Sequence, residues 1–381
     1  MGRQFSMKAV AAIMLCVAIV TFAATFIVLS FHFGAHSPHH GDMQRLREMR
    51  EIISRRYVGD ADEAHLTDMA LAATVFALGD PWSRYLTAEE YAEHLVRARN
   101  QHQGIGILFY RIEDTNEILI DSVTPGSPAE EAGLVAGDVI VRVADQPGAK
   151  LDNEEVRQII TDHYGGTVTL EVRGEDDVMR TVYVAVRAFF VSPVAFEMKE
   201  GDVGYIRIAN FDLTSGTETL DAIETLREDG AESLIFDVRS NPGGRVDELL
   251  MVLDHLLPEG ELFVFADQDG NESIRMSGPD YLAMPMVVLV NGHSFSAAEF
   301  FGAILQEKDW AQIVGTPTSG KSRSQIMISL HGGGAVQLST SRYLTPGRVD
   351  LYETNGIQPD YLVENADGED LQLAKALELL G

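Results

Sequence analysis

The stretch MVVLVNGHSFSAAEFFGAILQEKDWAQIVG (residues 286–315) decides the class of fold. It begins with five apolar residues, continues with an amphipathic run that starts at SAAE, and ends with a second short apolar run, AQIVG. A short apolar run bounded by turn residues is typical of a buried strand, and a longer run with apolar residues at three- and four-residue spacing is typical of a helix. We therefore predict a strand, a helix and a second strand.

The same alternation extends over residues 188–381. Runs typical of strands, VGYIRI, SLIFDVR, MVVLV and AQIVG, alternate with runs typical of helices, TSGTETLDAIETLRED, RVDELLMVLDHLL and SAAEFFGAILQEK. Strands and helices in alternation indicate an α/β domain. Residues 101–187 instead hold five short β-like runs and read as a compact β-rich module, and residues 43–100 have the spacing of helices.

Composition limits the class of protein. The chain has 381 residues, enough for two or three domains, and 45% of them are hydrophobic, which indicates a folded protein. Its formal net charge of -29 repels phosphate backbones, so we do not expect a nucleic-acid partner. The single cysteine, Cys16, excludes an intramolecular disulfide.

The N-terminal segment has the length and polarity of a membrane anchor. Residues 9–31 carry no charge, follow Arg3 and Lys8, and at about 1.5 Å per residue can cross a ~30 Å hydrocarbon layer. We predict a cytoplasmic stub and a single transmembrane helix in residues 1–34, with the rest of the chain on the extracytoplasmic side of the cytoplasmic membrane. Residues 35–42 are histidine-rich but lack cysteines or carboxylates at ligand spacing, so we interpret them as a solvated linker and predict no metal site.

The β-rich module has features of a peptide-binding domain. Its GIGI segment can present backbone N–H groups to an anion at the head of a strand. The run SVTPGSPAEEAGLVAGDVIVRVADQP (residues 122–147) resembles the signature of PDZ domains, which hold the free carboxylate of a peptide tail. The resemblance implies a groove formed by Gly104, Ile105, Gly106 and Ile107, with Ile159 and Ile160 as the opposite wall. Core packing is the alternative interpretation of the last two residues.

Ser296 is a candidate nucleophile within NGHSFSAAE. It also fits a capping box with Glu299, and the two interpretations are compatible, because a serine at a helix N-terminus faces free N–H donors that could stabilise an oxyanion. A hydrolase built on His293 and Ser294 is an alternative, although adjacent residues of an extended segment point to opposite sides.

The proton acceptor could be a lysine. Lys321 follows Ser296 by 25 residues, and Gln325 would share a face with it if this stretch is extended. A lysine acts as a base only when burial lowers its pKa from about 10.4. An ordinary surface lysine remains the alternative.

Five stretches together resemble the C-terminal processing peptidase family, which is tail-specific and uses a Ser/Lys dyad. NGHSFSAAE and GTPTSGKSRSQ are similar to its serine and lysine boxes. The other three stretches are GDPWSRYLTAEEY, FDVRSNPGG and YLTPGRVDLYETNGIQPDYLVE. The order of the boxes also agrees, from about residue 43 to the C-terminus.

The resemblance implies a multidomain chain whose α/β core is of the crotonase-like, Clp protease-like kind. It implies Ser296 as nucleophile, Lys321 as general base and Gln325 as the residue that orients the lysine. Backbone donors of the oxyanion hole would come from Gly243, Gly244 and Ala297. Two residues depart from the family pattern: we expect Phe295 to narrow the pocket and Ser322 to alter the turn that seats Lys321.

The sequence therefore predicts a membrane-anchored serine endopeptidase that captures protein tails with its PDZ module and needs no cofactor. Its partners would be proteins or peptides with free C-terminal tails. The resemblance also leaves open an activating partner or a homo-oligomer. The alternative from another class is an inactive or resting PDZ scaffold that binds tails without cutting them.

Overall fold

The computed structural model describes residues 40–381 except 113, 175 and 367. The predicted cytoplasmic stub and anchor (1–34) and most of the linker therefore lie outside the described residues. Within the described part of the chain, no helix combines the length and apolar character that crossing a bilayer requires. The chain divides into two compact units, residues 1–71 and 72–381.

The first unit contains α2 (His40–Arg56) and the start of α3 (Glu63–Phe76). An Arg50 guanidinium nitrogen donates to the Glu63 carbonyl oxygen at 3.2 Å, which ties the two helices together. None of the side chains of α3 is buried. The helical spacing of residues 43–100 is thus confirmed for these two helices.

The second unit continues with β1 (Arg84–Leu86) and α4 (Ala88–Arg97). Thr87 caps the start of α4, because the Glu90 N–H donates to the Thr87 hydroxyl at 3.2 Å and the Thr87 N–H donates to the Glu90 carboxylate at 2.8 Å. Strand β1 was not expected within the helical segment. It pairs antiparallel with β18 (Ala335–Leu344), some 250 residues later in the chain.

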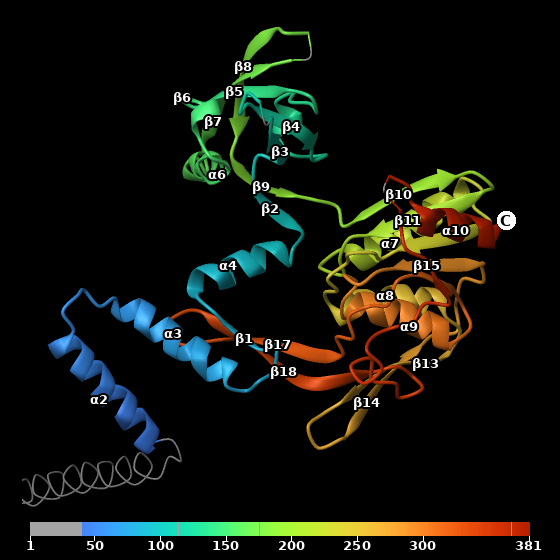
Figure 1. The fold of residues 1–381 in the computed structure, drawn as a ribbon. Helices are drawn as coiled ribbons and strands as arrows, with labels where there is room; N and C mark the ends of the chain where they lie inside the picture. Colours follow the sequence, from blue (N-terminus) through green and yellow to red (C-terminus); the bar gives the residue numbers. More distant parts are fainter. Residues whose placement is uncertain (1–39, 113, 175, 367) are drawn as a thin grey trace, which may run out of the picture. The chain divides into compact units, whose positions relative to one another are not determined.

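The β-rich module is confirmed, and Figure 1 shows it as the blue-green to green part of the ribbon. Strand order in its main sheet is β3-β4-β5-β7-β8, with β6 paired to β5, while β2 and β9 pair where the chain enters and leaves the module. Its strands are β2 (Gln101–Gly104), β3 (Ile107–Arg111), β4 (Ile118–Val123), β5 (Val139–Val143), β6 (Gln146–Pro147), β7 (Thr167–Arg173), β8 (Met179–Ala185) and β9 (Arg187–Phe190). Its helices are α5 (Pro128–Glu131), a 3₁₀ turn (Gly148–Lys150) and α6 (Asn153–Asp162).

The α/β domain is built on a six-stranded sheet of order β10-β11-β12-β15-β16-β19. Strand β10 runs antiparallel to β11, and the other neighbours are parallel, as the alternation of strands and helices predicts. The strands are β10 (Val194–Lys199), β11 (Val203–Ile208), β12 (Ser233–Asp237), β15 (Met286–Val290), β16 (Gln312–Gly315) and β19 (Tyr361–Leu362). The helices are α7 (Ser215–Glu228), α8 (Val246–Leu256), α9 (Ala297–Glu307) and α10 (Leu371–Leu380).

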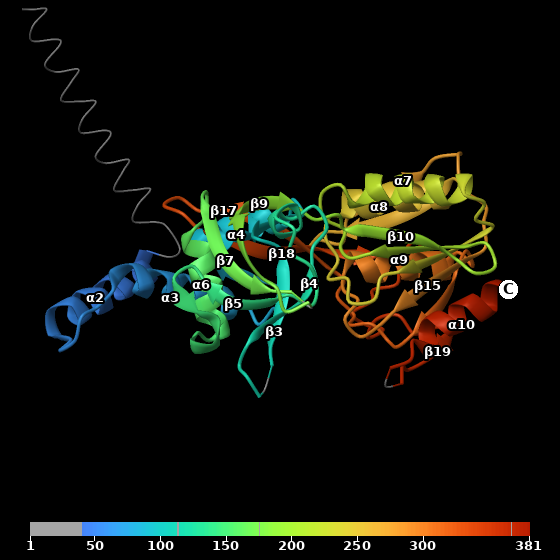
Figure 2. The same ribbon diagram turned by 90° about the horizontal axis from the view of Figure 1, so that it is seen from above.

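Alternate residues of these strands pack against different helices. Ile206, Phe236 and Val288 face one side, where they pack with α7, α8 and α9. Their neighbours Ile235 and Val287 face the other side, where they pack with α10. Figure 2 shows α7 and α10 on opposite sides of these strands. Burial of both faces explains why the strands read as continuous apolar runs rather than as alternating ones.

A second sheet completes the domain. Its order is β1-β18-β13-β14, and β17 pairs with β18 to form a long hairpin. The further strands are β13 (Gly260–Ala266), β14 (Glu272–Ser277) and β17 (Arg323–Ser329). The register of the hairpin shifts between Ser324 and Gln325. The segment that carries the predicted base therefore enters this sheet just after Lys321.

Candidate active site

Ser296 lies at the N-terminus of α9 in a strained conformation. The turn from β15 into α9 gives it φ 53° and ψ -118°, a region that residues with a Cβ rarely adopt. Such a conformation costs roughly 1–3 kcal/mol and is characteristic of functional sites. The side chain is nearly buried, with 7% exposed.

The alternative pair His293 and Ser294 does not form a site. The Ser294 hydroxyl donates to the Val238 carbonyl oxygen at 2.8 Å and accepts from the Asn291 N–H at 3.1 Å. Ser294 is fully buried and His293 is exposed. Ser294 therefore holds the turn together, and this geometry excludes it as an accessible nucleophile.

Glu299 links the serine segment to the lysine segment. Its carboxylate is fully buried and accepts hydrogen bonds from the N–H groups of Ser296 (2.8 Å) and Lys321 (2.8 Å). It also accepts from the Gly320 N–H at 2.6 Å. Two hydroxyl donors complete the set, from Thr318 at 2.6 Å and Ser319 at 3.0 Å. The capping carboxylate thus fixes both predicted catalytic segments at once.

Lys321 lies in a partly buried environment that favours its neutral form. Burial lowers its pKa from the ordinary 10.5, and the nearby Arg84 lowers it further, while Glu299 and Asp80 act in the opposite direction. Its Nζ atom lies 4.9 Å from the centroid of the Trp82 ring. The side-chain amine of Lys321 has no hydrogen bond or ion pair among the described residues.

Gln325 lies near the predicted base, but its amide is engaged elsewhere. Its Nε2 donates to the Arg323 carbonyl oxygen at 2.6 Å and to the Ser339 hydroxyl at 3.2 Å. Strand β17 starts after Lys321, and the register shift before Gln325 removes the simple alternation on which the shared-face argument depends. Its role in orienting the lysine stays a prediction.

The backbone donors predicted for the oxyanion hole differ in their availability. The Gly243 N–H already donates to the Asn241 side chain at 2.8 Å. In the described part of the chain, the N–H groups of Gly244 and Ala297 have no hydrogen-bond acceptor. A Cβ on Gly243 would come within 2.9 Å of the Ser296 Cβ. Gly243 is thus a close packing neighbour of Ser296, and the other two donors are the ones free to meet a negative charge.

One cavity of about 720 Å³ brings most of these groups together. Ser296, Lys321, Gln325, Gly243 and Gly244 all line it. Apolar side chains from β13, β17 and β18 form part of its wall, among them Phe265, Ile326 and Tyr343. The cavity therefore brings the predicted nucleophile and the predicted base together with N–H donors and an apolar surface.

The two departures from the family pattern have different consequences from those expected. Phe295 does not line this cavity and so does not narrow it. The fully buried Ser322 hydroxyl donates to Asp350 and accepts from the Tyr352 N–H at 3.2 Å. Ser322 therefore anchors the lysine segment to the loop after β18, rather than only altering a turn.

Asp212 is a further carboxyl group in the cavity, and the sequence pattern gave no signal for it. Burial raises its pKa to about 6, and Glu248 contributes in the same direction while Arg245 opposes. Its carboxylate accepts no hydrogen bond from the described residues.

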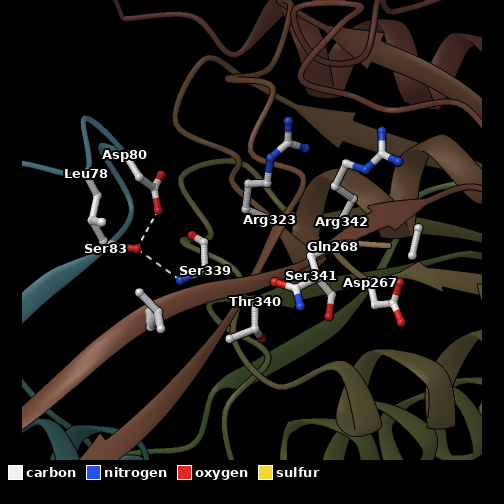
Figure 3. A pocket seen from close by; sticks show the side chains of 12 residues that line it. Leu78, Asp80, Ser83, Asp267, Gln268, Arg323, Ser339, Thr340, Ser341 and Arg342 are labelled. Carbon is white, nitrogen blue, oxygen red and sulfur yellow. Dashed lines mark hydrogen bonds between the residues drawn. The ribbon is translucent and has the colours of Figure 1, made fainter. Parts of the chain in front are cut away.

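A neighbouring cavity of about 580 Å³ shares Arg323 with the first one. Figure 3 shows its lining side chains, with Asp80 and Ser83 from the segment before β1 and Arg342 from β18. Ser83 donates to Asp80 and accepts from the Ser339 N–H at 3.0 Å. This network fixes the segment that places Trp82 beside Lys321.

The predicted groove residues of the β-rich module differ in their surroundings. Gly104 lines a cavity of about 340 Å³ with Thr161 and Tyr164. Ile105 and Ile160 belong to the hydrophobic core of the module, with 3% and 8% of their surfaces exposed. For Ile160 the structure thus agrees with the core-packing interpretation. Gly106 has a φ of 84°. Ile107 is the first residue of β3, and the side chain of Ile159 is half-buried.

The described residues contain no cluster of three or more histidine, cysteine, aspartate or glutamate side chains arranged to hold a metal ion. Histidines 36 and 39 of the linker lie outside those residues.

Comparison with known proteins identifies the family. Residues 202–363 match the family model of peptidase family S41, and residues 94–173 match the PDZ domain. The chain carries a peptidase domain of the S41 kind. Both predicted modules, the PDZ domain and the protease core, are therefore present, and the chain is a serine protease of the carboxyl-terminal processing type.

Relatives of this S41 peptidase resemble it over most of their length. The carboxyl-terminal-processing protease of Synechocystis is 29% identical over 346 residues, which cover 87% of this chain and 80% of the relative. The carboxy-terminal processing protease CtpA of Bacillus subtilis is 29% identical over 362 residues, 93% of this chain and 77% of the relative. Among solved structures, a photosystem II D1 C-terminal processing protease is 26% identical with a TM-score of 0.52, covering 88% of this chain and 90% of that one.

Proposed function

We propose that this S41 peptidase cleaves proteins near their C-termini with Ser296 as nucleophile and Lys321 as general base. The observation that carries the proposal is the buried Glu299 carboxylate, which accepts hydrogen bonds from the N–H groups of both residues. The lowered pKa of Lys321 supports the same assignment, since only a neutral amine can take a proton from the serine.

The proposed reaction uses only groups of this chain. The Ser296 hydroxyl attacks the peptide carbonyl carbon while its proton passes to the Lys321 amine. The negative charge on the carbonyl oxygen meets the free N–H groups of Gly244 and Ala297. The Lys321 ammonium then gives its proton to the leaving amine, and water releases the acyl group from the serine by the same steps.

The PDZ domain supports a role in substrate selection. Domains of this kind extend a sheet with an incoming peptide and hold its free carboxylate on a glycine loop. Gly104 and Gly106 have φ values of 129° and 84°, which a glycine adopts readily and other residues do not. We propose that the domain captures the tail of a protein substrate.

We also propose that residues 9–31 anchor the protease in the cytoplasmic membrane, with its catalytic domain on the extracytoplasmic side. The uncharged length of this segment and the preceding Arg3 and Lys8 support the proposal. Retention of the full-length protein in membranes after alkaline carbonate washing is expected, together with its release when residues 1–39 are deleted. An equal release of both forms would contradict the anchor.

The catalytic assignment is tested with the substitutions Ser296→Ala and Lys321→Ala. Each is expected to reduce cleavage of an unfolded protein by at least about 10³-fold while leaving the circular dichroism spectrum unchanged. Lys308→Ala, at a half-buried position just after α9, is the matched control and should cleave normally. Full turnover by the Lys321→Ala variant would show that another group is the base.

A specific observation favours the resting-scaffold alternative. Within the described residues, the Lys321 amine makes no hydrogen bond, and Gln325 is held by Arg323 and Ser339. In this alternative the protein binds tails but does not cut them until substrate or a partner moves these side chains. A serine-reactive fluorophosphonate probe separates the two states, because labelling of Ser296 in the protein alone requires an active base.

A further inference from the structure

The catalytic cavity is positively charged although the chain carries a net charge of -29. Two of its cations are neutralised: Arg245 lies 2.6 Å from Asp247, and Arg323 lies 3.0 Å from Asp350. Its charged lining residues are Arg84, His94, Arg97, Asp212, Arg245, Asp247, Lys321 and Arg323. The excess of positive charge therefore comes from the two arginines outside these pairs, Arg84 and Arg97.

Arg84 and Arg97 have little compensation from carboxylates. The Arg84 Nε donates to a neutral acceptor, the Gln337 side-chain oxygen, at 3.0 Å, and the structure gives its terminal nitrogens no partner among the described residues. Arg97 lies 3.4 Å from Glu93, and 62% and 57% of the two side chains are exposed. Exposed ion pairs of this kind contribute little, so both guanidinium groups remain able to bind an anion.

His94 completes the cluster. It precedes Arg97 by three residues on α4, so the two side chains lie on the same face of the helix. Burial lowers the pKa of His94, and the positive charges of Arg84 and Arg97 lower it further. The three side chains are thus close enough to act on one another. A group of like charges without an anion destabilises a fold, and such groups are common at functional sites.

We propose that Arg84, His94 and Arg97 form a carboxylate subsite of the catalytic cavity, which gives the peptidase a preference for substrates with an acidic group near the cleaved bond. This inference rests on the proposed function of the cavity. Arginine suits the role because its planar group binds a carboxylate through two parallel hydrogen bonds. The carboxylate comes either from an aspartate or glutamate side chain or from the free end of the peptide.

Binding in the absence of cleavage tests the subsite directly. The full-length protein with Ser296→Ala is titrated with four fluorescent peptides of one sequence, which carry glutamate or glutamine at one position and a free or amidated C-terminus. We expect the glutamate peptides to bind at least about tenfold more tightly than their glutamine counterparts. A difference that follows the C-terminus instead identifies the free end as the source of the carboxylate.

Substitutions locate the effect. Arg84→Gln is expected to abolish the tenfold difference, and Arg97→Gln to reduce it. The Arg84→Gln variant is the decisive one. Arg97 also lines the cavity that contains Gly104, so the effect of its substitution is not specific to the catalytic cavity. Arg342→Gln is the matched control: this arginine lines the neighbouring cavity (Figure 3), is exposed, and forms no ion pair with the described residues. It should leave the difference intact.

Two results would overturn the subsite: equal binding of all four peptides, or a preference that persists in the Arg84→Gln variant. The cleavage rates of the same peptides by the protein with Ser296 intact are measured in parallel. If none is cleaved, the proposed function fails, yet the binding data still decide whether the carboxylate subsite exists.

Discussion

At the scale of single residues, the chemistry depends on how the fold shifts ordinary side chains. The proposed role of Lys321 as base depends on burial and on Arg84, which favour its neutral form. A sequence cannot reveal this, since Arg84 is 237 positions away and exposure is a property of packing. What the sequence does show is the presence of the lysine at a suitable distance along the chain from a helix-capping serine.

The pH dependence of cleavage should report this shift. Because the neutral amine is the active form, kcat/KM is expected to rise with pH, with a midpoint below the ordinary lysine value of 10.5. Removing the positive charge in Arg84→Gln raises the pKa of Lys321, so the midpoint should move to higher pH. Arg342→Gln should leave it in place. If the pH midpoint of kcat/KM is unchanged or lower in the Arg84→Gln variant, the positive charge of Arg84 does not lower the pKa of Lys321.

Asp212 should make the folded state less stable above pH 6. Its pKa rises from 3.8 in the unfolded chain to about 6, so between these values the folded protein keeps a proton that the unfolded chain has lost. The free energy of unfolding therefore falls as pH rises through this interval, and the cost is complete above it. Asp212→Asn is expected to stabilise the protein by roughly 1–3 kcal/mol at pH 7.5 and by nothing at pH 4.

Urea unfolding followed by tryptophan fluorescence measures this difference. Asp247→Asn is the control, because Asp247 is exposed and paired with Arg245 and should give no gain at pH 7.5. A variant Asp212→Asn that is no more stable than the wild type at pH 7.5 would show that its carboxyl group ionises without cost.

At the scale of elements, the predicted strands and helices of the α/β domain and the β-rich module are confirmed, because each has a strong apolar pattern of its own. Strand β1 was missed since it has three residues and pairs with β18 far along the chain. The hairpin of β17 and β18 carries a register shift that no local pattern marks. This shift also explains why the simple spacing of Lys321 and Gln325 does not describe their contacts.

The first turn of α9 is the element that joins the proposed catalytic groups, Ser296 and Lys321. The sequence identified Glu299 only as a capping residue, whereas its carboxylate also accepts from the Lys321 N–H. In Glu299→Gln, one acceptor oxygen is replaced by an NH₂ group that would face N–H donors. We expect a loss of about 1–3 kcal/mol in the free energy of unfolding for each unsatisfied donor, and a fall in kcat of at least about 10²-fold.

The control for this substitution is Glu307→Gln, at the other end of α9, where one carboxylate oxygen accepts from the exposed Gly347 N–H. It should retain activity and most of the stability. Denaturant titration and peptide cleavage are measured for both variants. If Glu299→Gln cleaves as fast as Glu307→Gln, the carboxylate does not hold the catalytic segments together.

At the scale of the whole molecule, the order of modules was predictable because each has a distinct pattern of apolar residues and turn motifs. The carboxylate subsite was not predictable, since Arg84 lies on a strand, His94 and Arg97 lie on a helix, and only the fold brings them to the cavity of Ser296. The same holds for Trp82, whose ring lies over the Lys321 amine. The pattern of residues along the sequence does not show which residues from different parts of the chain contact one another in the fold.

The PDZ domain and the catalytic cavity should contribute differently to the cleavage of a tailed protein and of a short peptide. Gly106 has φ 84°, and a Cβ there would come within 2.3 Å of the Ser127 Cβ, whereas a Cβ on Gly104 would meet no atom within 4 Å. Gly106→Ala should therefore disturb the PDZ loop by steric overlap, and Gly104→Ala only by its backbone conformation. We expect Gly106→Ala to slow cleavage of a tailed protein at least about tenfold more than cleavage of a short peptide, because the peptide needs only the catalytic cavity. Gly104→Ala should show a smaller difference. Equal slowing of both substrates by Gly106→Ala would mean that the PDZ domain supports the fold of the protease rather than the choice of its substrate.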